Sequence, residues 1–139
     1  MNRKAKISID LMGGENSPTK CLQGIDFFLN RNKNPDDCFF YLFGDKNLIG
    51  EKIKKYKFLK NNYELIDTKI VVSDDLPALS AVKKGKDSSM WKCIESQISL
   101  GSDVSLSAGN TGVLLVMSKM ILKTLEDVDK PALAGLWPN

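Results

Sequence analysis

The sequence predicts an α/β fold, a mostly parallel β-sheet with helices on both of its faces. Two observations support this prediction. Short apolar runs typical of strands alternate along the chain with longer segments whose apolar residues recur at helical spacing. In addition, glycine-rich turns at residues 10–16 and 107–112 each follow a short apolar run and precede a helical segment. The expected architecture is a Rossmann-like three-layer sandwich, with residues 1–139 forming a single domain.

The first half of the chain predicts three strands and two helices. Residues 5–11 are strand-like, and Ser17 followed by Pro18 is typical of a helix N-cap with proline at the first helical position. The continuous apolar run 38–43 indicates a strand covered on both faces. A lysine-rich helix follows it, and residues 64–72 are the third predicted strand.

Lysines are concentrated in the second predicted helix, where Ile49, Ile53 and Tyr56 form the inward face. The lysines expected to point mostly outward are Lys46, Lys52, Lys54, Lys55, Lys57 and Lys60. A solvated helix face is the simplest interpretation of this pattern. The alternative is a docking surface for an acidic protein or an anionic lipid.

The second half predicts two further helices and two strands. Residues 73–86 have no clean period and are predicted to be a loop with one helical turn. Residues 87–89 begin a helix, and 103–107 form the fourth strand. The run 113–122 is long, free of glycine and proline, and expected to be a largely buried helix. Residues 131–137 are predicted to be a fifth strand.

Composition excludes several classes of function. The chain has no histidine, which removes Ser-His-Asp and Cys-His catalysis and argues against a zinc site. Its three cysteines form no CxxC pair, so a reduced cytoplasmic compartment is expected. The formal net charge of +3 gives no reason to expect nucleic acid as a partner. No secretory signal or membrane-spanning segment is predicted.

The turn at residues 107–112, Ser-Ala-Gly-Asn-Thr-Gly, has the composition of an anion site. Gly109 and Gly112 allow the backbone to turn tightly and approach a ligand, and Asn110 and Thr111 are both good N-cap types. A helix that begins here presents free N–H groups and the positive end of its dipole. A capped loop that binds nothing is the alternative.

The turn at residues 10–16 strengthens the anion interpretation. Both turns follow strands of one predicted parallel sheet, so both are expected at the edge formed by the carboxyl ends of the strands. Neither matches the G-x-G-x-x-G dinucleotide fingerprint or the P-loop. The sequence therefore predicts an anion site of a less common kind.

Three motifs together resemble a known family. They are DLMGGENSP at 10–18, KDSSMW at 86–91 and SAGNTG at 107–112. In order and approximate spacing they are similar to the bacterial phosphate acyltransferases of phospholipid synthesis, and PALA at 131–134 matches the segment that comes after these motifs in that family. The chain covers less than half of a typical member, so it is expected to be an N-terminal part that ends within the sheet.

The resemblance implies that an acyl group moves from acyl–acyl carrier protein to inorganic phosphate, giving acyl phosphate. It implies a homodimeric cytoplasmic enzyme, peripherally associated with the inner face of the membrane, with no metal or organic cofactor. The candidate substrate-binding residues, phosphate-binding above all, are Gly13, Gly14, Asn16, Ser88, Ser89, Ser107, Gly109, Asn110, Thr111 and Gly112. Asp10 and Asn110 are the candidate catalytic residues. Because a carboxylate would repel phosphate, Asp10 is expected to orient the glycine turn or a nearby lysine.

Two positions depart from the family pattern. The family usually carries a histidine after the third strand and an arginine in the basic loop before the paired serines. Ser73 and Val82 stand near those positions here.

Three alternatives remain open on the sequence. A phosphotransacetylase-like enzyme would use acyl-CoA as the donor instead. A receiver-like regulatory module would use Asp10 as phosphoacceptor, but Leu11 and Met12 supply no second acidic group. A non-catalytic fragment or degenerate homologue would fold and pair with a partner without catalysing a reaction.

Overall fold

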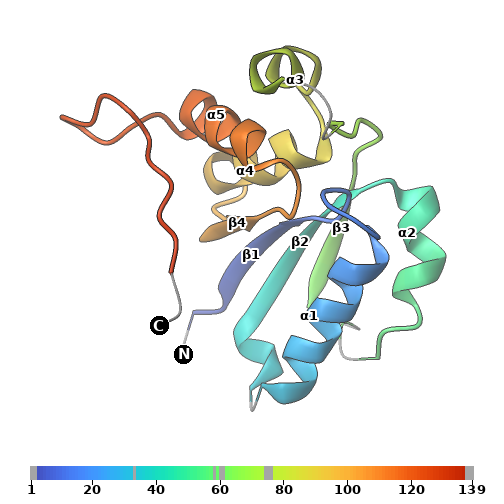
Figure 1. The fold of residues 1–139 in the computed structure, drawn as a ribbon. Coiled ribbons are helices and arrows are strands. Elements are labelled where there is room, and N and C mark those ends of the chain that lie inside the picture. The colour runs from blue at the N-terminus through green and yellow to red at the C-terminus, as the bar shows by residue number, and fades with distance from the viewer. Residues whose placement is uncertain (1–2, 33, 58, 60–61, 74–76, 137–139) are drawn as a thin grey trace.

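A computed structural model describes residues 3–32, 34–57, 59, 62–73 and 77–136. Its centre is a four-stranded parallel sheet with the strand order β3-β2-β1-β4 (Figure 1). The strands are β1 (Ala5–Asp10), β2 (Cys38–Gly44), β3 (Tyr63–Asp67) and β4 (Val104–Leu106). The helices are α1 (Thr19–Arg31), α2 (Lys46–Ile53), α3 (Ala78–Lys84), α4 (Ser89–Ser99) and α5 (Thr111–Leu122), with a 3-10 turn at Pro35–Asp37. The α/β prediction is confirmed.

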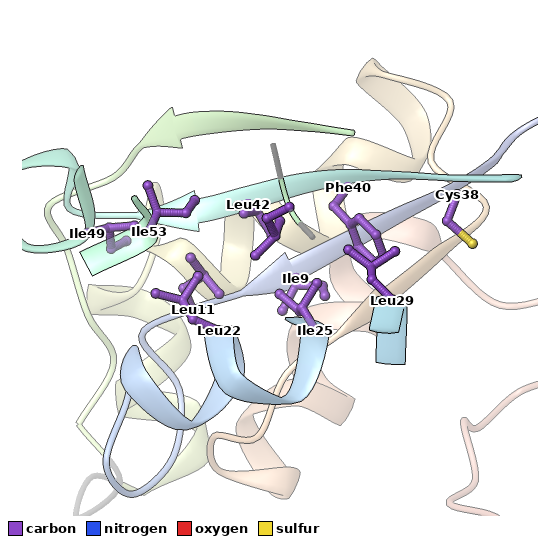
Figure 2. Close-up of a cluster of buried hydrophobic side chains, with 11 residues drawn as sticks. Ile9, Leu11, Leu22, Ile25, Leu29, Cys38, Phe40, Leu42, Ile49 and Ile53 are labelled. Atoms are coloured by element: carbon purple, nitrogen blue, oxygen red, sulfur yellow. The ribbon is translucent and has the colours of Figure 1, made fainter. Parts of the chain in front are cut away.

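The main core lies between the sheet and α1 and α2 (Figure 2). Residues at alternate positions of β1 and β2 point to this face, because side chains of a strand alternate between its two sides. They meet one apolar stripe of α1. Buried members include Ile9, Leu11, Leu22, Ile25, Leu29, Phe40, Leu42, Ile49 and Ile53. Each such side chain contributes about 1.5–3 kcal/mol by leaving water.

The opposite face of the sheet is covered by α4. Its Cys93 packs against Tyr41 and Phe43 of β2. Toward β1 the contact is polar: the buried Ser8 hydroxyl lies 2.5 Å from Ser96 Oγ and also donates to Ser102 Oγ at 2.8 Å. These hydroxyls satisfy one another, so α4 approaches the sheet closely without leaving Ser8 or Ser96 unpaired.

A second core joins α3, α4 and α5, which carry its buried residues. It contains Ala81, Val82, Met90, Ile94, Val113 and Met117. Val82, near the position where the family usually has arginine, is 5% exposed and therefore serves packing here. In the described part of the chain, none of the helices is long and apolar enough to cross a bilayer.

Two sequence-based predictions in the second half of the chain are wrong. Residues 73–86 were expected to hold one helical turn, but α3 has seven residues because Ala81 and Val82 pack into the second core. Helix α5 was expected to be largely buried, but Met120 is 50% and Leu122 36% exposed. The reason is that α5 packs on α3 and α4 instead of between a helix layer and the sheet.

Two strand predictions are also wrong. The third strand stops at Asp67, one residue before Thr68, whose N donates to Gly44 O. The chain then leaves the sheet, and Ile70 pairs with Ser88, the residue that caps α4, in an isolated bridge. The predicted fifth strand is extended coil over residues 131–136, and residue 137 lies outside the described residues. Apolar composition suggested a strand there, but no backbone hydrogen bond joins 131–136 to a described strand.

The start of α1 also differs from expectation. Ser17 was predicted to cap the helix, but its hydroxyl donates to Gly13 O at 2.5 Å. The helix begins at Thr19, and the preceding residue Pro18 makes no side-chain cap hydrogen bond. Ser17 instead stabilises the glycine turn that precedes it.

Candidate functional site

The two glycine-rich turns meet at one edge of the sheet. Strands β1 and β4 are parallel neighbours, with Ile9 opposite Leu106, so the residues that follow them emerge side by side. Ser107 Oγ donates to Asp10 Oδ2 at 2.7 Å and accepts from Gly109 N at 3.2 Å. The prediction that both turns share this edge is confirmed.

Glycines allow the close contact between the turns. A Cβ atom on Gly13 would lie 2.6 Å from Asp10 Oδ2 and 2.8 Å from Gly109 N. Gly14 has a backbone φ of +85°, a conformation that residues with a side chain rarely adopt. A Cβ atom on Gly14 would lie 2.7 Å from Ala108 O. Only glycine fits either position without a shift of the opposite turn.

The turn after β4 leads into the N-terminus of α5. Asn110 caps the helix through its side chain, with Oδ1 accepting from Val113 N at 3.1 Å. A hollow of about 330 Å³ adjoins this helix end, bordered by Gly14, Glu15, Ala108, Gly109, Asn110, Thr111 and Gly112. The first-turn N–H groups and the positive end of the helix dipole suit an anion here.

A second hollow, of about 380 Å³, adjoins the first and shares Gly14, Glu15 and Ala108 with it. Lys20, on the first turn of α1, borders this second hollow and supplies a cation beside the glycine turn. Sequence reasoning did not single out Lys20. The available signal was its place on the helix that directly follows the first glycine-rich turn.

The structure brings most of the predicted site residues together. Gly13, Ser107 and the residues of the first hollow form one continuous region. Asn16 lies beside it, in a neighbouring hollow that Lys20 also borders. Their roles in binding stay predictions.

Ser88 and Ser89 do not border either hollow. Ser88 Oγ accepts from Trp91 N at 3.2 Å, so it caps α4. Ser89 is 1% exposed, and its hydroxyl has no hydrogen-bond partner in the described part of the chain. Helix α4 contacts the site through Met90. The Cε atom of Met90 lies 2.7 Å from the position that a Cβ atom on Gly109 would occupy. The structure therefore gives Ser88 a structural role, and ligand binding by either serine stays a prediction.

Thiol chemistry is disfavoured at this edge of the sheet. Cys21 borders the second hollow, and burial raises its pKa above the usual value despite a hydrogen bond with Ser17. Burial, with a smaller contribution from the charge of Asp10, raises the pKa of Cys93 to about 12. A raised pKa keeps both groups as neutral thiols near pH 7, which are poor nucleophiles. Among the residues that the structure describes, no three metal-ligating side chains gather.

Comparison with known proteins gives consistent matches. Residues 5–139 match the model of a family described as "Fatty acid synthesis protein". The phosphate acyltransferase of Pelagibacter ubique is 45% identical over 100% of this chain and 40% of its own length. Those of Azorhizobium caulinodans and Rhodopseudomonas palustris (strain BisB5) are each 37% identical over 100% of this chain and 39% of their own lengths. The chain thus spans about two fifths of these relatives.

Proposed function

The chain belongs to the fatty acid synthesis protein family, and from that premise we propose that its paired glycine-rich turns bind phosphate during acyl transfer. The observation that carries this proposal is the hydrogen-bonded contact between the turns at the N-terminus of α5. It combines backbone N–H groups, a helix dipole and Lys20 at one edge of the sheet, which suits a phosphate dianion. The relatives named phosphate acyltransferase support phosphate as a substrate.

In the proposed reaction, phosphate is the nucleophile and the acyl donor is a thioester. A phosphate oxygen attacks the carbonyl carbon of acyl–acyl carrier protein and forms a tetrahedral intermediate. The C–S bond then breaks, acyl phosphate is released, and the thiolate of the carrier takes up a proton. Because the second pKa of phosphate lies near neutrality, a large fraction of it is already dianionic, and the protein's task is to position it and stabilise charge on the carbonyl oxygen.

Asp10 fits a positioning role in this scheme. One carboxylate oxygen accepts from Ser107 Oγ and the other from Met12 N, so each binds a turn residue. The side chain is 1% exposed. Asp10 therefore orients the turns that contact phosphate, and Asn110 orients the first turn of α5 by capping it.

The acyl donor, the homodimer, the cytoplasmic location and the peripheral membrane association remain parts of the proposal that follow from the family resemblance. The lysines of α2 and the segment after it support an acidic protein as donor, because Lys52, Lys54, Lys55 and Lys57 are all exposed. Acyl carrier proteins are acidic, and opposite charge speeds association.

Phosphate titration followed by NMR tests the proposal on this chain. We expect saturable shifts of the amides of Gly14 and of residues 109–112, while potassium chloride at equal ionic strength leaves them unchanged. Thr111→Ala should weaken binding by about 1–2 kcal/mol if its hydroxyl contacts the charged group. If phosphate shifts other amides but not those of residues 109–112, the anion site lies elsewhere and the motif only caps a helix.

A further inference from the structure

An apolar cavity of about 460 Å³ opens between α1 and the β4 side of the sheet. Gly24 and Phe28 of α1, Ile7 of β1 and Leu106 of β4 border it. Phe28 is 46% and Leu106 50% exposed, so the described chain leaves this part of the sheet face uncovered. The volume lies within the range of about 300–1,000 Å³ that is typical of small-molecule sites.

One end of this cavity reaches the candidate phosphate site. Asp10, Ser107 and Ala108 border it there. Cys21 and Ala108 also border the hollow that holds Lys20 and the glycine turn. The apolar cavity and the candidate anion site are therefore adjacent and have lining residues in common. This arrangement suits a ligand with an anionic head and an apolar chain.

Gly24 keeps the cavity open. It lies inside α1, where glycine is less favourable than alanine because it loses more conformational freedom on folding. A Cβ atom at this position would meet no atom within 4 Å. The packing of the described chain thus gives no reason for glycine here, whereas a ligand lying along α1 would.

We propose that this cavity binds the hydrocarbon chain of the acyl group, with the acyl carbonyl at the end formed by Ser107 and Ala108. The proposal rests on the phosphate acyl transfer proposed above and assigns the substrate's apolar part to α1 and β4. A fully buried methylene adds about 0.8 kcal/mol, or about fourfold in affinity, so chain length should have a measurable effect on binding.

The test measures binding of methylphosphonate and dodecylphosphonate to the 139-residue chain by calorimetry, with the long-chain probe below its micelle concentration. We expect dodecylphosphonate to bind at least tenfold more tightly. Gly24→Leu fills the cavity and should remove that gain while leaving methylphosphonate affinity unchanged. Gly50→Leu is the matched control, because a Cβ on Gly50 of α2 also meets no atom within 4 Å and α2 does not border the cavity. It should alter neither affinity.

NMR of the unsubstituted chain gives a second measurement that does not depend on the folding of a variant. The methyl groups of Ile7, Ile25 and Leu106 should shift with dodecylphosphonate and not with methylphosphonate. If methylphosphonate binds but the long chain adds no affinity and moves none of these methyls, the chain-binding proposal is overturned and the cavity is a packing surface for another polypeptide segment. If dodecylphosphonate moves these methyls while methylphosphonate fails to bind, the phosphate proposal falls and the chain site stands. If neither methylphosphonate nor dodecylphosphonate binds, the phosphate-binding proposal and the chain-binding proposal are both overturned.

Discussion

Ser107 Oγ donates a 2.7 Å hydrogen bond to Asp10 Oδ2 and so joins the ends of β1 and β4 across 97 residues of sequence. The parallel pairing of the two strands places these residues next to each other. Because Asp10 is 1% exposed and its second oxygen accepts from Met12 N, its carboxylate holds the two turns in place. The candidate site therefore depends on this contact between its two halves.

A double-mutant cycle on Asp10→Ala and Ser107→Ala measures the strength of this contact. We expect a coupling energy of about 1.5–3 kcal/mol, since the hydrogen bond is partly buried and involves a charged acceptor. Urea unfolding provides the free energies. The exposed ion pair between Lys54 and Glu51 serves as the control, and its coupling should stay below about 0.5 kcal/mol. A coupling energy below about 0.5 kcal/mol for Asp10 and Ser107 would mean that their hydrogen bond is not what holds the two turns together.

Gly13→Ala should lower the free energy of unfolding by about 1–3 kcal/mol, because the new methyl group would overlap Asp10 Oδ2 and Gly109 N. Phosphate-induced shifts of residues 109–112 should be lost with it. Gly50→Ala is the control within α2. It has open space at its Cβ position and should stabilise the protein by about 0.4–1 kcal/mol. If Gly13→Ala and Gly50→Ala have the same free energy of unfolding, the two turns can move apart with little loss of stability.

Local signals in the sequence predicted most of the elements around the site. The apolar runs of β1 and β2, and the polar caps Ser88 and Asn110, depend on residues close together in the chain. Contacts between distant residues were not predictable in this way. Ser17 has the composition of an N-cap, yet the folded turn offers its hydroxyl the carbonyl of Gly13.

The site itself was predictable only in part. Parallel topology placed both glycine turns at one edge, so Asp10 and Ser107 could be expected near each other. Their hydrogen bond depends on the orientation of two side chains that lie 97 residues apart in the sequence. The position of Lys20 beside the first glycine turn depends on where α1 begins. The prediction of a fifth strand at residues 131–136 was wrong for a similar reason. The composition of a segment does not show whether a neighbouring strand is available to pair with it.

Stability should fall with pH above about 9, in part because of Cys93. Burial raises the pKa of this thiol from 9.0 to about 12. Between these values the unfolded chain releases a proton that the folded chain keeps, so rising pH favours unfolding by up to about 1.4 kcal/mol per pH unit. Cys93→Ala should remove this part of the slope, while lysine and tyrosine titrations stay common to both proteins. Urea unfolding at pH 8, 9 and 10 measures the difference, and identical slopes would contradict it.

The lysines of α2 and the turn after it give a prediction about the acyl donor. Reversing Lys52, Lys54 and Lys55 to glutamate should weaken binding of acyl carrier protein at low salt, because it removes a positive surface that an acidic partner would meet. The helical CD spectrum should not change, since all three side chains are exposed. Added salt should reduce the difference from the unsubstituted chain, as screening weakens charge attraction.

A matched control separates this surface from a general effect of net charge. Lys83, Lys84 and Lys86 are also exposed, and they lie at the C-terminal end of α3 and just beyond it. Their reversal changes the formal charge by the same amount, so both triple variants would weaken binding equally if only net charge mattered. We expect the α2 variant alone to lose affinity in calorimetric titrations at low salt. Equal losses, or no loss in either variant, would leave the lysines of α2 with no role beyond that of a solvated helix face.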